Sequence, residues 1–231
     1  MMTNPFQWEH PKAMDYNDTI RRRIIGYDLI FELMKDLIDA SIEQPEHITI
    51  VGAGGGQELS TLLPLLPAAH FKAIDPSSTM LALAEQRLVA EELSGDVAYI
   101  EEELIAVKLE PADLVTCHLV LHFLPTVALK KALLHEIAMH VKVGGTVYLS
   151  SINGDLEDAA FQQTLTAWGK AMIRNGVKEH QWQAFRASFG DTLMPISTTE
   201  LLKLCDEEGL QIRHAYFRAY HIEAFCLERV K

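Results

Sequence analysis

The sequence is short of positive charge. Its 231 residues hold 20 Lys and Arg against 32 Asp and Glu, which gives a formal net charge of −12. Tight binding to nucleic acid needs clustered Lys and Arg to neutralise phosphates, and the basic cluster here is limited to Arg21, Arg22 and Arg23. The composition therefore argues against direct contact with nucleic acid.

Long apolar runs and frequent cysteines are also lacking. No stretch approaches the roughly 18 apolar residues of a membrane span, and the first residues, MMTNPFQWEHPK, lack the basic and apolar regions of a signal peptide. Cys117, Cys205 and Cys226 are far apart and odd in number, which favours buried thiols over disulfides or a metal site. We therefore expect a cytosolic, cytoplasmic protein that contacts no membrane.

A glycine-rich segment, ITIVGAGGGQELS at residues 48–60, joins an apolar run to a helical pattern. Glycines there allow a turn whose backbone can approach a ligand closely. A dinucleotide-binding fingerprint would have its third glycine at position 57, which is Gln57, and no Lys followed by Ser or Thr completes a phosphate-binding loop. The segment therefore favours an adenosyl compound that has no pyrophosphate.

The order of elements predicts an α/β fold with a Rossmann-like, doubly wound sheet that is mostly parallel, because strand and helix patterns alternate along the chain. The last 22 or so residues hold two strand patterns with no helix between them, which predicts an antiparallel C-terminal hairpin. The predicted strands are residues 48–51, 70–75, 96–100, 112–121 and 146–151, and the predicted helices are residues 58–66, 77–93, 127–141 and 197–208.

Two stretches lie outside this core of what we expect to be a single domain, residues 1–231. The first, residues 1–44, contains an amphipathic helix, YDLIFELMKDLIDAS, that should cover the sheet edge. The second, residues 153–195, holds two helical patterns around Asn175-Gly176 and follows a strand's carboxyl end. An insertion of that length at that place is a candidate helical lid.

These features together resemble the class I methyltransferases that use S-adenosylmethionine, over nearly the whole chain from about residue 16. The greatest likeness is to the carboxy-S-adenosylmethionine synthase branch and its small-molecule methyltransferase relatives. That branch has an arginine followed by a glycine-tyrosine pair near its start, here Arg22 or Arg23 and then Gly26-Tyr27. It also has an arginine in the lid ahead of the last helix, here Arg186.

The resemblance implies which residues hold the cofactor, S-adenosyl-L-methionine or its carboxylated form. Asp75 would accept both ribose hydroxyls, and Tyr27 would close over the site. Glu103 would flank adenine with Leu104, or else it belongs to a solvated run of glutamates. The implied cofactor-binding set is Tyr27, Gly52, Ala53, Gly54, Asp75, Pro76, Glu103, Leu104 and His118. The family has an acid two residues before its first glycine, where this chain has Ile50, which puts tight cofactor binding in question.

Methyl transfer needs alignment of the reacting atoms in a dry pocket, and a base only when the acceptor carries a proton. His122 is a candidate base or substrate contact, or else a packed structural histidine. Arg186 is a candidate clamp for a carboxylate on the acceptor or on a carboxylated cofactor, or else a surface residue. His118 and His122 are four apart, but no third ligand has a recognisable spacing, so we expect no metal site.

Three functions are compatible with these patterns. The first is a methyltransferase that acts on a small, anionic metabolite by in-line transfer from S-adenosylmethionine. The second is a carboxy-S-adenosylmethionine synthase-like enzyme of transfer-RNA wobble-uridine modification, and the third is a non-catalytic regulatory domain of the same fold. The expected partner is a small-molecule substrate, with a homodimer left open.

Overall fold

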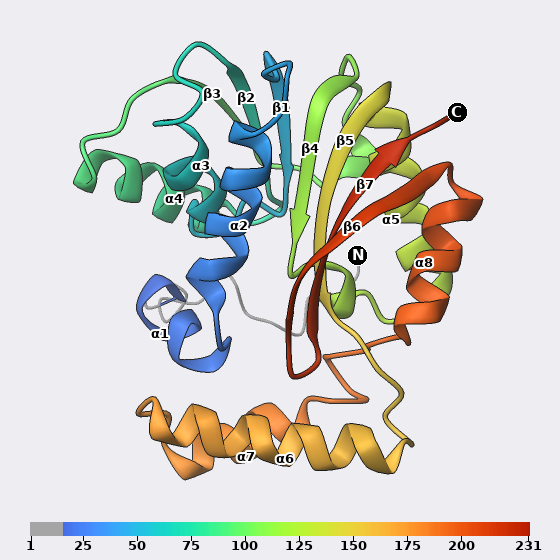
Figure 1. The fold of residues 1–231 in the computed structure, drawn as a ribbon. Coiled ribbons are helices and arrows are strands. Elements are labelled where there is room, and N and C mark those ends of the chain that lie inside the picture. Colours follow the sequence, from blue (N-terminus) through green and yellow to red (C-terminus); the bar gives the residue numbers. More distant parts are fainter. Residues whose placement is uncertain (1–15) are drawn as a thin grey trace.

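The computed structural model describes residues 16–231, and across these residues one seven-stranded sheet forms the centre of the molecule (Figure 1). Its strands are β1 (His47–Val51), β2 (His70–Ile74), β3 (Asp96–Ile100), β4 (Ala112–His118), β5 (Val141–Ile152), β6 (Leu210–Ala219) and β7 (Ile222–Arg229). They lie in the order β3-β2-β1-β4-β5-β7-β6. Neighbouring strands among β1 to β5 are parallel, whereas β7 is antiparallel to β5 and β6. The predicted mostly parallel Rossmann-like sheet with a C-terminal hairpin is confirmed.

Eight α-helices and two short 3₁₀ helices accompany the sheet in the described part of the chain. They are α1 (Tyr16–Arg23), α2 (Tyr27–Asp39), α3 (Gln57–Leu62), α4 (Ser78–Ala90), η2 (Leu104–Ala106), η3 (Leu121–Phe123), α5 (Val127–His140), α6 (Ala159–Arg174), α7 (Glu179–Ala187) and α8 (Thr198–Glu207). Side-chain caps begin several of them, since Ser77 accepts from Met80 N and Ser197 from Glu200 N. None of these helices combines the length and apolar character needed to cross a membrane.

Helices cover both faces of the sheet because its central strands carry apolar side chains on both sides. Ile50 belongs to the core formed with α2, α3 and α4, whereas its neighbour Val51 belongs to the core formed with α5 and α8. The three cysteines are buried and free, as the sequence predicts. The parallel strands thus present their carboxyl ends at one edge of the sheet, where ligands bind in such folds.

Two predicted elements differ from those observed. The helix after the glycine segment ends at Leu62, well before Pro67, because Pro64 disfavours a helical residue before it and cannot donate into a helix. The amphipathic helix of the lead-in, α2, covers a face of the sheet and not its edge. Its buried residues, including Phe31 and Met34, belong to the same core as α3 and the central strands.

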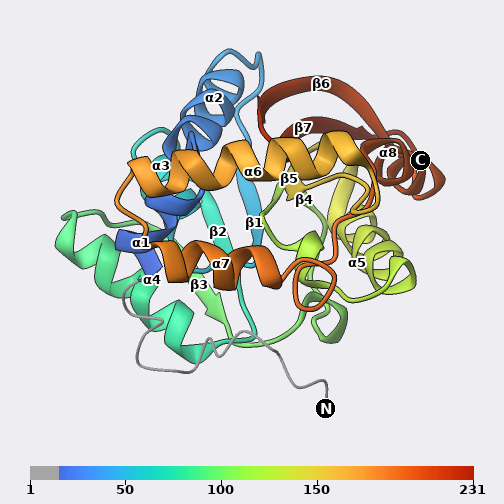
Figure 2. The ribbon, with the colours of Figure 1, turned by 90° about the horizontal axis from the view of Figure 1, so that it is seen from below.

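The helices α6 and α7 lie across the carboxyl edge of the sheet, as the view from below shows (Figure 2). Their facing sides are rich in aromatic rings: Trp168 makes edge contacts with Phe185 and Phe189, and Trp182 packs on Gly169. Trp168 Nε1 also donates to Arg23 O at 2.8 Å. The predicted lid region therefore contains two helices, and one of its aromatic residues is hydrogen-bonded to the lead-in.

Candidate active site

The turn after β1 depends on glycine at three positions. Gly52, Gly54 and Gly56 have φ values of 71°, 50° and 79°, in the left-handed region. A Cβ at Gly52 would lie 2.4 Å from Val120 Cγ2, and one at Gly56 would lie 2.9 Å from the Cα of Ala84. The glycines therefore let the turn lie close to the loop after β4 and to α4.

Asp75 stands at the end of β2, and backbone amides orient its carboxylate. Gly54 N donates to Oδ2 at 2.9 Å and Ser77 N donates to Oδ1 at 3.0 Å. The residue is 8% exposed. These two bonds fix the direction of the carboxylate beside the glycine turn.

A cavity opens between the glycine turn, the end of β4 and the helices of the lead-in. It is lined by backbone and apolar groups together with Glu58 and His118, which are 4% and 5% exposed. The lining residues are Tyr16, Tyr27, Phe31, Gly52, Ala53, Gly54, Gly55, Gln57, Glu58, His118 and Leu119. This arrangement suits a ligand that has an apolar body and a polar or cationic end.

His118 is held between a carboxylate and a phenol. Its Nδ1 lies 3.3 Å from Glu58 Oε1, and its Nε2 is hydrogen-bonded to the hydroxyl of Tyr216 at 2.9 Å. Burial is the main cause that raises the pKa of Tyr216 well above its usual value, so this phenol keeps its proton while it is hydrogen-bonded to Nε2. The ring of His118 therefore presents Nδ1 to the side of the cavity where Glu58 lies.

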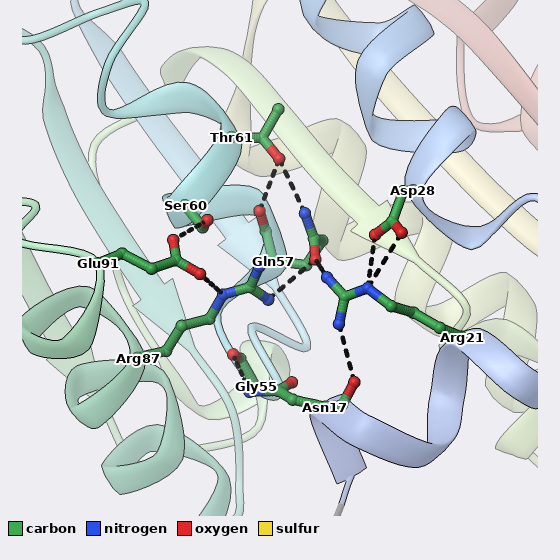
Figure 3. A network of polar contacts seen from close by, with 9 residues as sticks. All are labelled: Asn17, Arg21, Asp28, Gly55, Gln57, Ser60, Thr61, Arg87 and Glu91. Carbon is green, nitrogen blue, oxygen red and sulfur yellow. Dashed lines mark hydrogen bonds and ion pairs between the residues drawn. The ribbon is translucent and has the colours of Figure 1, made fainter.

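Helix α1 covers the glycine turn and is fixed there by polar contacts (Figure 3). Asn17 Nδ2 donates to Gly55 O at 3.1 Å, and a Cβ at Gly55 would lie 2.1 Å from Asn17 Oδ1. Arg21 donates to Gln57 Oε1 at 2.8 Å, and Arg87 from α4 donates to the same oxygen at 2.9 Å. Gln57, which stands where a dinucleotide fingerprint would have a glycine, thus links α1 to α3 and α4.

Comparison with known proteins agrees with this geometry. The family described as "Methyltransferase domain" matches residues 50–147, which include the glycine turn, Asp75 and His118. A solved structure of magnesium protoporphyrin IX methyltransferase from Synechocystis PCC 6803, with bound S-adenosylhomocysteine, superimposes with a TM-score of 0.71 at 15% identity and covers 96% of both chains. Residues 50–147 carry a methyltransferase domain, and the fold of the chain is that of the S-adenosylmethionine-dependent methyltransferases.

Two further similarities concern the whole chain. Carboxy-S-adenosyl-L-methionine synthase from Shewanella baltica is 23% identical over 219 residues, which cover 94% of this chain and 89% of that protein. An O-methyltransferase family protein from Burkholderia thailandensis superimposes with a TM-score of 0.65 at 16% identity, covering 96% of this chain and 61% of the other. This methyltransferase chain thus spans about three fifths of that structural relative.

Five of the nine residues predicted for cofactor binding line the cavity of the methyltransferase domain, and Asp75 lies beside them. The five are Tyr27, Gly52, Ala53, Gly54 and His118. Pro76 and Glu103 are exposed, on the loops after β2 and β3. The side chain of Leu104 is buried in the core formed with α5 and α8, so only its backbone is available at the carboxyl edge.

The two residues predicted to act in catalysis lie outside the cavity lining. His122 is 3% exposed, and its Nδ1 accepts from Ile152 N at 3.2 Å. Burial, together with the charge of Lys130, lowers the pKa of His122 to about 3. Arg186 is exposed on α7. Their predicted roles stay predictions, since their surroundings bring neither side chain to the glycine turn.

Several residues of the site were not foreseen from the sequence. Tyr16 and Glu58 line the cavity, and Tyr216 holds His118. The guanidinium carbon of Arg21 lies 5.5 Å from the centroid of the Tyr27 ring. The one available signal was Glu58 itself, an acid in an otherwise inward-facing helical turn directly after the glycines.

No group of three or more His, Cys, Asp or Glu side chains in residues 16–231 is arranged to hold a metal ion.

Proposed function

We propose that this protein transfers a methyl group from plain S-adenosylmethionine to a small molecule. The observation that carries the proposal is Asp75, whose carboxylate is oriented by Gly54 N and Ser77 N at the end of β2. An acid at this point, about twenty residues beyond a glycine turn, suits the two hydroxyls of a ribose. The adenosyl group would then extend along the carboxyl edge, with its methionine part at the glycine turn.

Each end of the cofactor has a matching environment. The glycine turn lets the backbone approach the methionine part closely, because Gly52, Gly54 and Gly56 carry no side chain. The reaction is an in-line displacement, in which the acceptor atom bonds to the methyl carbon while the carbon–sulfur bond breaks and the sulfonium becomes a neutral thioether. The protein's task is to align these atoms and exclude water, for which the aromatic lining by Tyr16, Tyr27 and Phe31 is suited.

The charge of the cavity favours the plain cofactor over a carboxylated one. Glu58 is its acidic group, and among the described residues that line it none is Lys or Arg. Arg186, the residue expected to clamp a carboxylate, is exposed on α7. An additional carboxylate beside the sulfonium would lie near a buried acid of the same sign, which is unfavourable in a low-dielectric site. The same charge disfavours the anionic acceptor expected from the sequence.

Carboxy-S-adenosylmethionine synthesis is the second candidate, and one observation favours it. The similarity to Shewanella enzymes of that name extends over 94% of this chain. The two candidates differ in the ligand that the purified protein retains. Native mass spectrometry separates them, because a carboxylated cofactor, plain S-adenosylmethionine and its demethylated product differ in mass.

Calorimetry with S-adenosylmethionine tests the proposal directly. We expect Asp75→Ala to weaken binding by about 1.5 to 3 kcal/mol, the range for hydrogen bonds to a charged group. Asp206→Ala is the matched control, because Asp206 is exposed on α8 and should leave the affinity unchanged. Equal affinity for the Asp75 variant and the wild-type protein would contradict the ribose assignment.

A further inference from the structure

Glu58 is a buried carboxylate in the cavity lining, and the side chain that it faces there is that of His118. It is the second residue of α3 and its side chain is 5% exposed. None of the described residues that share the lining with it is Lys or Arg. The nearby Arg21 is engaged elsewhere, by Asp28, Gln57 and Asn17 O. Burying a carboxylate is costly unless a cation or hydrogen bonds compensate for the lost water.

The side chain that faces Glu58, that of His118, has one nitrogen atom without a hydrogen bond in the described chain. His118 Nδ1 is buried and, within the described chain, makes no hydrogen bond, although it lies 3.3 Å from Glu58 Oε1. Its other nitrogen is fixed by Tyr216. A buried polar atom that lacks a hydrogen bond indicates that a ligand or water completes the site. His118 lines the cavity at the glycine turn.

The position two residues before the first glycine offers no alternative acid. Ile50 is fully buried, and its side chain belongs to the apolar core formed with α2 and α3. Glu58 reaches the same turn from its other side, where α3 begins. A negative charge is therefore present at the methionine end of the proposed site, and it comes from a different element.

We propose that Glu58 is the counter-charge for the ammonium group of the cofactor's methionine part, with His118 and Tyr216 as positioning residues that hold its carboxylate at the cavity. This inference rests on the proposed function. It implies that the site requires a cation at this end of the ligand, so that an adenosyl ligand without the amino-acid part gains nothing from Glu58.

Two ligands with a neutral sulfur separate the contribution of the amino-acid part from that of the adenosyl group. S-adenosylhomocysteine has the amino-acid part, whereas 5′-methylthioadenosine keeps the adenosyl group and the thioether and lacks it. By calorimetry on the full chain we expect Glu58→Gln to weaken S-adenosylhomocysteine at least tenfold and to change methylthioadenosine less than twofold. Glu110→Gln removes an exposed acid at the opposite edge of the sheet and should change neither.

The outcomes distinguish this inference from the function on which it rests. If the wild-type protein binds S-adenosylmethionine, S-adenosylhomocysteine and methylthioadenosine with no measurable affinity, the proposed function fails. If all bind and Glu58→Gln leaves S-adenosylhomocysteine unchanged, the counter-charge role is overturned. An equal loss for methylthioadenosine also overturns it, because Glu58 would then support only the shape of the site. Tyr216→Phe should reproduce a smaller, ammonium-dependent loss, since the phenol hydroxyl positions His118.

Discussion

Arg21 and Arg87 donate to one and the same oxygen, Oε1 of Gln57, at 2.8 and 2.9 Å. The first arginine belongs to α1 and the second to α4, and Gln57 is the first residue of α3 (Figure 3). One amide therefore joins the helix that covers the glycine turn to the two helices beneath it. Tyr16 at the start of α1 lines the cavity, so α1 forms part of the cavity wall.

We expect Gln57→Ala to loosen α1 without unfolding the sheet. The loss of the hydrogen bond from Arg21, which is partly exposed, should cost about 1 to 2 kcal/mol of local stability, and amide exchange in residues 20–24 should become about tenfold faster. Mass spectrometry of hydrogen exchange measures this. Thr61→Ala is the control, because Thr61 bonds only to the other side of Gln57. Unchanged exchange in α1 would show that Gln57 does not hold it.

Cofactor should slow exchange in the covering segments. Because α1 and the lid region, residues 153–195, lie over the carboxyl edge of the sheet, we expect S-adenosylhomocysteine to slow their amide exchange more than that of β2 and β3. The part of this expectation that concerns residues 1–15 falls outside the described residues. Equal exchange with and without ligand in α1 and α6 would leave these helices as ordinary packing elements.

His122 should make stability fall in mild acid. Burial and the nearby Lys130 lower its folded pKa to about 3, below the unfolded value near 6.5. The stabilisation is complete above pH 6.5 and is lost as the pH falls toward 3, because the unfolded chain binds the proton first. Between pH 7 and 5 we expect a loss of about 2 kcal/mol in the free energy of unfolding. The variant His122→Asn keeps an acceptor for Ile152 N but does not titrate. In urea titrations its loss in the free energy of unfolding between pH 7 and 5 should be smaller than that of the wild-type protein by this amount.

Lys130 should be destabilising at neutral pH. It is 1% exposed and donates to Leu124 O, and burial lowers its pKa to about 8. The pKa of an unfolded lysine is near 10.4. The destabilisation by the buried charge of Lys130 is therefore complete below pH 8 and disappears as the pH rises toward 10.4. We expect Lys130→Met to raise the free energy of unfolding by about 2 kcal/mol at pH 7. The two proteins should converge above pH 10, and a variant less stable at pH 7 would contradict this account.

Arg186 provides a test of the similarity to the synthases. Because its side chain is exposed on α7, we expect Arg186→Ala to change the affinities for plain and carboxylated S-adenosylmethionine equally and less than twofold. Calorimetry with both ligands measures this. A loss confined to the carboxylated ligand would restore the predicted clamp, and Arg186→Lys should then recover only part of it, since an ammonium cannot form two parallel hydrogen bonds.

The sheet could be predicted from local patterns, whereas the site could be predicted only in part. The strands at residues 96–100 and 70–75 were recognised because each is a short apolar or alternating run between turn signals, and both lie in the sheet within a residue. Asp75 and the glycines were recognised because they follow strands at a fixed edge. A residue that directly follows a parallel strand lies at the carboxyl edge of the sheet, so its position can be predicted from the sequence.

The remaining site residues depend on contacts between distant segments. Tyr216 reaches His118 across 98 residues, and Arg21 reaches Gln57 across 36. No periodicity carries that information, so Tyr16 and Tyr216 could not be assigned. For His122 the structural interpretation that the sequence left open agrees with its buried hydrogen bond to Ile152 N. The side chain of Leu104 faces a core because η2 turns it away from the carboxyl edge.

The hydrogen bond from Trp168 to Arg23 O spans 145 residues, and it has a consequence for the order in which the molecule assembles. A chain still being synthesised contains the glycine turn and Asp75 long before it contains Trp168. Contacts between such distant segments form late, because closing a long loop costs entropy before the contact is gained. The lid region and the lead-in are therefore joined after the segment with the glycine turn and Asp75 has been made, and until then this segment lacks the cover that α6 and α7 give it.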